Sequence, residues 1–546
     1  MTNEFPLPAA GSGPAGIALG ADGNLWFSEF PGNRIGRITP AGGITEFAVP
    51  TAGSNPEAAC LGRDGNIWFT ETAGNKVGTI NTAGIIKEYA VPTAAALPLG
   101  LGHGPDGSIW FTEYAAGFNQ IGKVTGFPLP NWYLAEGSTA WGFDEYITVE
   151  NPNTVPVNVE VTYNTSAGPV PGGTLPIAAT SQLTIDPRAV VGNADFSTRL
   201  VCVEGETIAV DRTMSWTGTG AASPEGHNSV GVTSPYTIWY LPEGSSQWGF
   251  ETWLLIQNPT AMEATCQVTY MIEGAAPVTV AKTVPGGSRI TVPMVDDIGN
   301  ADASIRVLSS VPVIPERAMY RYDKREGHDS IGTPARALNY FLAEGSTAWG
   351  FTTYVLVQNP NNAAVDVTLT YMTPSGPVVM PAFPMPANSR RTIRVNDQLP
   401  DQDVSTMVSA TAPIIAERAM YWETATGEAT HDSIGLPFSH DIFYLPDGDT
   451  SGGRETWTLV QNPNGSDVPV RITYMRPAGA GTVIEDVNVP ANSRMTFNMS
   501  DSVPDGRAAI MVECRDINPY LGIMAERAMY WDSRGAGTDS IGGFSD

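Results

Sequence analysis

The sequence predicts an all-β protein, a partial β-propeller of about three four-stranded blades followed by four tandem β-sandwich modules. Two internal repeats of different length, one of 42 residues and one of about 100, support this prediction. The 546 residues also include 58 Gly and 44 Pro, which suits many short strands joined by tight turns. No stretch shows helical periodicity over three turns.

The first repeat runs through residues 1–130 and predicts the propeller. The segments ADGNLWFSE, RDGNIWFTE and PDGSIWFTE place Trp26, Trp68 and Trp110 at a constant spacing of 42. The D-G pair supplies the positive φ that a two-residue hairpin needs. NRIGRI, NKVGTI and NQIGKV follow downstream. Each unit therefore divides into four short strands, the size of one propeller blade.

A fragment of this repeat stands at the start of the chain. EFPLP, at Glu4–Pro8, aligns with Glu46–Pro50 and Glu88–Pro92, and Phe127–Pro130 aligns as a shortened fourth copy. We expect Glu4–Pro8 to be the outer strand of a blade whose other strands lie upstream, or one completed by strand exchange. The first interpretation, an incomplete propeller entered within a blade, is favoured. It would also account for the lack of a visible signal peptide.

These motifs resemble the blades of the virginiamycin B lyase-like (streptogramin lyase) propeller family, and the resemblance covers residue 4 to about 130. It implies a propeller fold. In the family's founding enzyme it further implies a metal-assisted elimination that opens a cyclic peptide ester, with histidines, a glutamate and Mg²⁺. A full propeller of the family has seven blades. The candidate catalytic residues here are His103, which precedes a hairpin turn and is more readily a solvated loop residue, and Glu113.

Three glutamates end the second strand of the predicted blades: Glu29, Glu71 and Glu113. In a closed ring they would line one rim, where they could bind a ligand. The alternative is that they pair with loop amides in the same way in every blade. Identical repetition favours this structural role, because a catalytic site normally gives different roles to different blades.

The second repeat predicts four sandwiches, immunoglobulin-like in architecture, with a small closed barrel as the alternative. Their predicted bounds are 131–236, 237–338, 339–440 and 441–546, which we call repeats 1 to 4. They open on NWYLAEGSTAWGF, IWYLPEGSSQWGF, NYFLAEGSTAWGF and IFYLPDGDTSGGR and close on HNSVG, HDSIG, HDSIG and TDSIG. This series resembles a domain of unknown function found repeated in secreted or cell-surface bacterial proteins, which implies export and no particular chemistry.

One arginine recurs in each repeat after an acidic residue: Arg212, Arg317, Arg418 and Arg527. Neighbours on a strand point to opposite faces, so the arginine should not pair with the acid beside it. We expect it to bind the Asp of DSIG or the Glu of AEG as a buried, structural ion pair that fixes how the first and last segments of a repeat meet.

Two further sets of residues recur in the first three repeats and not in the fourth. His227, His328 and His431 share one position, and one histidine per repeat leaves open whether they bind metal. Trp141, Trp248 and Trp349 lie in the WGF segment, where they could stack on glycans or fill the core beside Gly. We predict no metal site.

Composition excludes several partners. The net charge of −27 and the pI of about 4.5 argue against binding to nucleic acid and to anionic membrane surfaces. No apolar run is long enough for a transmembrane helix, so no membrane insertion is expected. The four cysteines, Cys60, Cys202, Cys266 and Cys514, never recur at equivalent positions, which predicts isolated core thiols.

The leading functional hypothesis is a non-catalytic extracellular or cell-surface protein, a scaffold, stalk or adhesin with a propeller binding face and no cofactor. Short linkers between the sandwiches would make a semi-rigid rod. Its partners would be other copies of itself or cell-surface components, including glycans. One alternative is a metal-dependent lyase of the virginiamycin B lyase type with Mg²⁺ as cofactor, and another is a carbohydrate-binding array.

Overall fold

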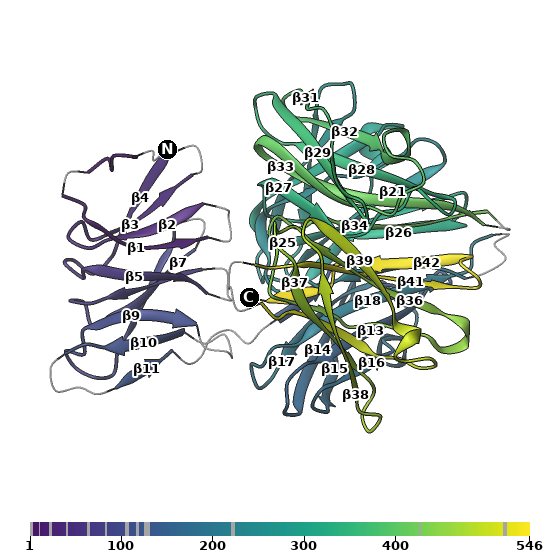
Figure 1. Ribbon diagram of the computed structural model, residues 1–546. Coiled ribbons are helices and arrows are strands. Elements are labelled where there is room, and N and C mark those ends of the chain that lie inside the picture. The colour runs from purple at the N-terminus through teal and green to yellow at the C-terminus, as the bar shows by residue number, and fades with distance from the viewer. Residues whose placement is uncertain are drawn as a thin grey trace. The chain divides into compact units, whose positions relative to one another are not determined.

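The protein is almost entirely β in the computed structural model, which confirms the predicted fold class. The chain divides into two compact units, residues 1–130 and 131–546 (Figure 1). The structure describes residues 4–9, 11–20, 24–39, 42–62, 66–81, 84–103, 109–115, 120–124, 131–219, 224–424, 427–516 and 521–545.

The first unit contains three antiparallel sheets, one for each 42-residue repeat. The first comprises β1 (Pro14–Leu19), β2 (Leu25–Glu29), β3 (Arg34–Ile38) and β4 (Ile44–Ala48). The second comprises β5 (Pro56–Leu61), β6 (Ile67–Glu71), β7 (Lys76–Ile80) and β8 (Ile86–Ala90). The third comprises β9 (Pro98–His103), β10 (Ile109–Glu113) and β11 (Ile121–Lys123). Neighbouring sheets contact each other through β1, β5 and β9.

The asparagine that opens each of the first two NxIGxI motifs, Asn33 or Asn75, ties one sheet to the next segment of chain. Asn33 has a φ of 54°, in the left-handed region that Asn tolerates better than most residues. Its amide nitrogen donates to the carbonyls of Val49 and Thr51 at 3.2 and 3.0 Å, and its oxygen accepts from the Ser54 amide at 2.7 Å. The glycine of the motif is required because a Cβ on Gly36 would collide with the Phe27 ring.

The expectation for the chain start is wrong in one respect, because Glu4–Pro8 forms no strand in the structure. Without a neighbouring sheet of its own to pair with, this segment has no ladder to join. The three D-G turns and Phe127–Pro130 lie outside the described residues.

Each repeat of the second unit builds two antiparallel sheets. In repeat 1 they are β12 (Asn131–Leu134), β17 (Phe196–Cys202), β14 (Val157–Thr165) and β15 (Gly168–Ile177), then β16 (Ser181–Ile185), β13 (Asp144–Asn151), β18 (Ala209–Trp216) and β19 (Glu225–Val230). In repeat 2 they are formed by β20 (Tyr236–Leu241), β21 (Phe250–Asn258), β22 (Ala264–Ile272), β23 (Val278–Val284), β24 (Ser288–Pro293), β25 (Ala303–Arg321) and β26 (Glu326–Ile331).

Repeats 3 and 4 follow the same order of pairing. Repeat 3 contains β27 (Ala337–Leu342), β28 (Phe351–Asn359), β29 (Val365–Thr373), β30 (Gly376–Val379), β31 (Phe383–Met385), β32 (Ser389–Arg394), β33 (Ser405–Thr424) and β34 (Gly427–Ile434). Repeat 4 contains β35 (Ile442–Leu445), β36 (Glu455–Asn462), β37 (Val468–Met475), β38 (Thr482–Val489), β39 (Ser493–Asn498), β40 (Ala509–Cys514), β41 (Met524–Trp531), β42 (Ala536–Ser540) and β43 (Gly543–Ser545). In repeats 2 and 3 one long strand, β25 or β33, belongs to both sheets.

Helices are few and short. They are α1 (Arg188–Val191), α2 (Met294–Ile298) and the 3₁₀ turns Val395–Asp397, Ser451–Gly453 and Met499–Asp501. Among the described residues, none of these could cross a membrane. The four cysteines are free thiols, with Cys202 and Cys266 buried and Cys60 and Cys514 partly buried.

The Asn of each Asn-Pro pair closes a loop inside its repeat. The Asn258 amide donates to the carbonyls of Met262 and Val284 at 2.7 and 3.1 Å, and its oxygen accepts from the Thr260 amide at 3.0 Å. Asn151, Asn359 and Asn462 make the equivalent contacts. A buried amide thus satisfies backbone groups that would otherwise be unpaired.

The four repeats form a closed ring, and the expected rod is wrong for residues 131–546. The last strands of the repeats contact one another in cyclic order, β19 with β26, β26 with β34, β34 with β42 and β42 with β19. Figure 1 shows β26, β34 and β42 near the middle of this unit. The buried apolar side chains of all four repeats also join into one cluster. Short linkers therefore bring the repeats face to face instead of end to end.

Candidate functional site

The recurring arginines lie where neighbouring repeats meet. Arg212, Arg317, Arg418 and Arg527 lie on β18, β25, β33 and β41, and all four are fully buried. We call the contacts between repeats 1 and 2, 2 and 3, and 3 and 4 the interior interfaces, and the contact between repeats 4 and 1 the closing interface.

At the first interior interface one guanidinium contacts three carboxylates. Arg212 Nη2 lies 3.1 Å from Glu136 Oε2 in its own repeat and 3.2 Å from Glu316 Oε1 in repeat 2. It also contacts the Asp329 carboxylate of repeat 2. The Glu136 backbone amide donates to Glu316 at 2.7 Å. The arginine therefore joins two repeats as well as two segments of one repeat.

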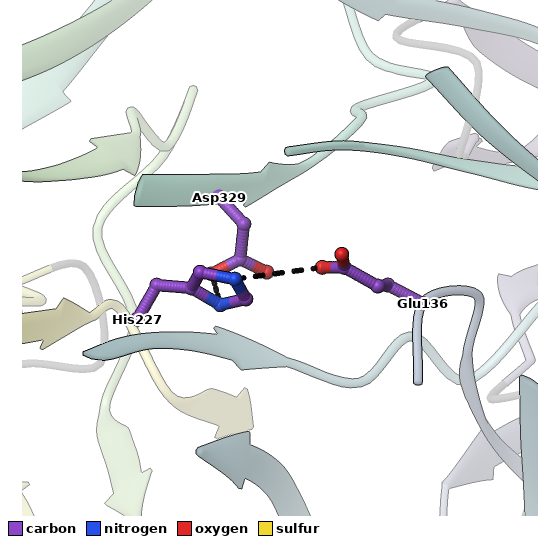
Figure 2. Close-up of side chains that lie close together, drawn as sticks. All are labelled: Glu136, His227 and Asp329. Carbon is purple, nitrogen blue, oxygen red and sulfur yellow. Dashed lines mark ion pairs between the residues drawn. The ribbon is translucent and has the colours of Figure 1, made fainter. Parts of the chain in front are cut away.

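A histidine and a tyrosine complete this interface. His227 Nδ1 lies 2.7 Å from Asp329 Oδ1, and Nε2 lies 3.9 Å from Glu136 Oε2 (Figure 2). His227 Nε2 also lies 3.1 Å from the Tyr320 hydroxyl, which donates to Glu136 Oε1 at 3.3 Å. Tyr320 belongs to repeat 2, so Glu136, Arg212 and His227 of repeat 1 each meet a partner from repeat 2.

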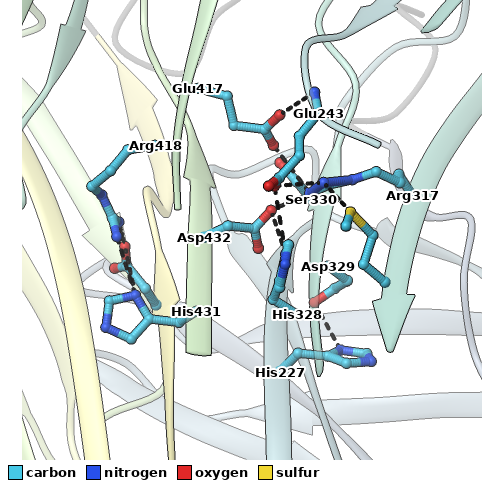
Figure 3. A network of polar contacts seen from close by, with 12 residues as sticks. His227, Glu243, Arg317, His328, Asp329, Ser330, Glu417, Arg418, His431 and Asp432 are labelled. Atoms are coloured by element: carbon cyan, nitrogen blue, oxygen red, sulfur yellow. Dashed lines mark hydrogen bonds and ion pairs between the residues drawn. The ribbon is translucent and has the colours of Figure 1, made fainter. Parts of the chain in front are cut away.

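The second interior interface repeats this network (Figure 3). Arg317 lies 2.8 Å from Glu243 and 3.2 Å from Glu417 and contacts Asp432. His328 Nδ1 lies 3.0 Å from Asp432 Oδ2.

In the third interior interface Arg418 lies 3.2 Å from Glu344 and 2.9 Å from Glu526 and contacts Asp539. His431 differs from the other two histidines because its Nδ1 faces Arg418 at 3.1 Å. Its Nε2 lies 3.1 Å from the Tyr530 hydroxyl.

The closing interface is built differently. Arg527 lies 3.9 Å from Asp211 of repeat 1 and donates to the backbone carbonyl of Asp447. The Asp447 carboxylate binds Arg507 at 2.7 Å and accepts from the Thr213 hydroxyl at 3.0 Å. Two arginines and two aspartates meet here, whereas an interior interface sets three carboxylates around one arginine.

Burial sets the protonation of these clusters. It raises the pKa of Glu136, Glu316 and Asp329, against the opposing effect of Arg212. Burial also lowers the pKa of His227 to about 4. Three carboxylates with one guanidinium and a neutral imidazole carry excess negative charge, so the buried cluster is stabilised by holding protons on its carboxylates.

The same residues could offer ligands to a metal ion. Glu136, His227 and Asp329 place one ligand atom each within 4.8 Å of one another, as do Glu243, His328 and Asp432, and Glu344, His431 and Asp539. In each set the two carboxylates already contact a guanidinium. A divalent cation there would be repelled by the arginine, so the geometry favours an arginine-centred ion pair.

The sequence prediction for the interior arginines is correct for the Glu of AEG, which binds the arginine of its own repeat, but not for the Asp of DSIG. The Asp of DSIG that binds each interior arginine comes from the next repeat, as does the Glu that precedes the next arginine. The role of Tyr320, Tyr421 and Tyr530 was missed. One signal in the sequence could have indicated it. Repeat 4 has Thr538 in place of the histidine and repeat 1 has Ser215 in place of the tyrosine, so the two residues are lost at the one interface that these repeats share.

The three tryptophans of the WGF segments are exposed, not core residues. Trp141, Trp248 and Trp349 are 78%, 69% and 80% exposed. Each has a φ of 58° and is followed by a glycine that also has a positive φ. The indole nitrogens of Trp141 and Trp248 lie 3.2 and 3.4 Å from the carboxylates of Asp195 and Asp302.

The candidate residues of the first unit differ in how deeply their side chains are buried. Glu29 and Glu71 are fully buried, and Glu113 is partly buried. Burial raises the pKa of Glu71 to about 7, with Glu88 adding to the effect. His103 is the last residue of β9, and its side chain lies outside the described part of the structure. A ligand-binding role for these residues stays a prediction.

Comparison with known proteins relates the first unit to one family. The family model of the Virginiamycin B lyase family matches residues 1–132. Over 41 residues the chain is 49% identical to virginiamycin B lyase of Bacillus licheniformis, which covers 8% of this chain and 14% of that protein. The predicted resemblance of the blades is thereby confirmed, while that of the later repeats stays a prediction.

Solved structures give a similar result. The chain is 46% identical to virginiamycin B lyase from Staphylococcus aureus, over 23% of this chain and 42% of that one, with a TM-score of 0.22. It is 27% identical to a streptogramin B lyase over 37% of this chain and 68% of that one, also with a TM-score of 0.22. The chain thus spans less than half the length of the Staphylococcus enzyme and 14% of the Bacillus one.

Replacing an interior arginine tests its role. We expect Arg317→Met to lower the free energy of unfolding by about 3–5 kcal/mol at pH 7, because Glu243, Glu417 and Asp432 lose their counter-charge in a buried site. The loss should shrink at pH 5, where the carboxylates take up protons. Urea denaturation at the two pH values measures both. Arg325→Met, at an exposed arginine, is the control and should change stability by less than about 0.5 kcal/mol.

Glu145 provides a second test, through pH. Its carboxylate accepts a hydrogen bond from the Ser138 amide at 2.6 Å. In repeats 2 to 4 the hydroxyl of a threonine accepts the equivalent hydrogen bond: Thr252, Thr353 and Thr456. Burial raises its pKa to about 8. Stability from the protonated form is complete below the unfolded pKa and is lost as pH rises through 8.

We therefore expect the melting temperature of Glu145→Thr, relative to wild type, to increase between pH 5 and about pH 8 and to level off above it. Thermal denaturation at several pH values measures this difference. A difference that does not vary with pH would contradict the assignment.

Proposed function

We propose that this chain is a non-catalytic, extracellular or cell-surface binding protein, in which the ring of four repeats is a rigid scaffold that presents tryptophans to a glycan. Its other partners would be cell-surface components or further copies of itself, with the blades as a second binding face. The family match of residues 1–132 supports homology to lyase propellers but covers only this part of the chain.

The observation that carries the proposal is the conformation of Trp141, Trp248 and Trp349. A bulky residue with a positive φ costs about 1–3 kcal/mol in backbone strain. Leaving an indole exposed also forgoes the free energy of burying it. Three repeats have an exposed, strained tryptophan at this position, while repeat 4 has Gly452 there with a φ of 61°. Such costs are expected at a binding surface.

A glycan fits this surface better than the other partner classes. An exposed, rigid aromatic face stacks on the apolar face of a sugar ring, and the neighbouring Asp195 or Asp302 carboxylate could accept from its hydroxyls. The net charge of −27 disfavours nucleic acid and anionic membranes.

The tryptophans also lie toward one end of the ring. Arg321 donates to the Trp248 carbonyl at 3.0 Å, which places Trp248 beside the turn between β25 and β26. The corresponding turns of other repeats contact one another, since Trp216 donates to the Lys324 carbonyl and Trp531 to the Pro224 carbonyl. Several weak sites at one end would bind a polymeric glycan with avidity.

Glycine substitution tests the proposal without disturbing the fold. We expect Trp141→Gly, Trp248→Gly and Trp349→Gly together to reduce binding on a glycan array at least about tenfold. The melting temperature should stay unchanged or rise, because glycine relieves the strain as it does in repeat 4. A wild-type chain that binds nothing on the array, or a triple variant that binds equally well, would refute the proposal.

A second candidate function is a metal-dependent lyase located in the blades, favoured by the match of residues 1–132. Under this hypothesis the chain with Mg²⁺ opens a streptogramin-type cyclic ester, and His103→Ala reduces the turnover. Product formation followed by mass spectrometry measures it. No turnover by the chain with Mg²⁺ would rule out this candidate for the chain as given.

A further inference from the structure

We infer that the closing interface is a dedicated recognition surface, built so that repeat 4 pairs with repeat 1 and with no interior face. The ring is made of head-to-tail contacts, in which the same two faces could in principle pair any repeat with any other. A chain of four such repeats leaves one face free at each end. The side chains on these two free faces determine whether the faces bind each other.

The face of repeat 1 that meets repeat 4 departs from the other repeats at several positions. Where repeats 2, 3 and 4 have Glu, Ala, Tyr, Asp and Arg, repeat 1 has Asp211, Thr213, Ser215, Asn228 and Gln182. In the interior interfaces the Glu and Asp of these positions bind the arginine of the preceding repeat, and the Tyr contacts its histidine.

The face of repeat 4 that meets repeat 1 departs at three positions. It has Asp447, Thr538 and Arg507 where repeats 1, 2 and 3 have Glu, His and Asp. Only Arg527 is kept. Without the histidine there is no imidazole for a tyrosine to contact, so Thr538 in repeat 4 agrees with Ser215 in repeat 1.

The other face of each of these two repeats, at an interior interface, keeps the cluster residues that repeats 2 and 3 have. Repeat 1 meets repeat 2 with Glu136, Arg212 and His227, and repeat 4 meets repeat 3 with Glu526, Tyr530, Asp539 and Arg494. Within the arginine clusters the changes therefore follow the interface and not the repeat, while Glu145 is one change of repeat 1 near its contact with repeat 2.

A change of charge shows that the two faces are matched. At the third interior interface Arg494 donates to the carbonyls of Gly345 and Val404 of the preceding repeat at 2.9 and 3.0 Å, which places its guanidinium near Asp403, and the charge of Asp195 acts on Arg289 at the first. At the closing interface the aspartate is replaced by Arg507, and the arginine by Gln182.

With its amide turned to satisfy both ends, Gln182 donates to the Pro446 carbonyl at 2.8 Å and accepts from the Ala508 amide at 3.1 Å. An arginine at position 182 would instead meet the Arg507 guanidinium. The neutral Gln182 therefore fits repeat 4, whereas the arginines of the interior faces do not.

The matched set discriminates against wrong pairing. A free repeat 4 face placed against an interior face would bring Arg507 against an arginine. A free repeat 1 face placed against an interior face would offer the interior arginine the shorter Asp211 in place of a Glu and the neutral Asn228 in place of an Asp. The ends of one chain are also held close by their linkers, which raises their effective concentration. Both effects favour closure within one chain.

Four full-length proteins test this inference: wild type, Gln182→Arg, Arg507→Asp and the double variant, which rebuilds the interior pair at the closing interface. We expect each single variant to exchange the amide hydrogens of β19 and β42 at least about tenfold faster, with those of β26 unchanged. The double variant should return to within about threefold of wild type. Asp403→Arg, which sets two guanidiniums against each other at the third interior interface, is the matched control and should speed exchange in β34 and β42 only.

The hydrodynamic radius of each protein in solution, from dynamic light scattering, gives a second measurement. Single variants should remain monomers with a larger radius, because the mismatch that opens the ring within a chain also prevents the same faces from pairing between chains, and the double variant should resemble wild type. Single variants with unchanged exchange and radius would overturn the inference. So would a double variant that exchanges as fast as, or faster than, the single ones or fails to fold.

Discussion

A buried guanidinium that cannot lose its charge is the constraint on which the second unit depends. Each interior arginine is fully buried and has acceptors from two repeats, so neither repeat satisfies it alone. A repeat separated from its neighbour would keep only the Glu of its own AEG segment as a partner for this charge, and the carboxylates of the neighbour would lose their arginine. Buried ion pairs add little net stability compared with apolar packing. What they contribute here is orientation, because only one placement of adjacent repeats pairs every charge.

This orientation explains how the sheets of four repeats present a fixed surface. Because the arginine strands lie next to the hairpins that end each repeat, the ion pairs also fix the turns beside the exposed tryptophans. The long strands β25 and β33 belong to both sheets of their repeats, so fixing the sheet that contains the arginine also fixes the second sheet. The surface is thus held by buried polar contacts on one side and by a shared apolar cluster on the other.

Much of the fold could be predicted from the sequence, but the way the repeats assemble could not. Period-two alternation and the spacing of 42 specify strands and sheets through local interactions. The partners of Arg317 come from positions about 100 residues away, and nothing in one repeat distinguishes its own Asp from the next. The burial of Glu29 and the exposure of Trp248 likewise follow from tertiary packing, because both residues lie in motifs compatible with either environment.

The closed ring also limits how the gene can change in length. Tandem repeats are readily gained or lost by recombination, and in an open stack each new copy simply extends the array. Here an added interior copy would preserve every face but require a smaller rotation from each repeat to the next, which the buried charges do not permit. Loss of repeat 1 or repeat 4 would remove one of the two matched faces. The number of repeats is therefore fixed by the geometry of the ring.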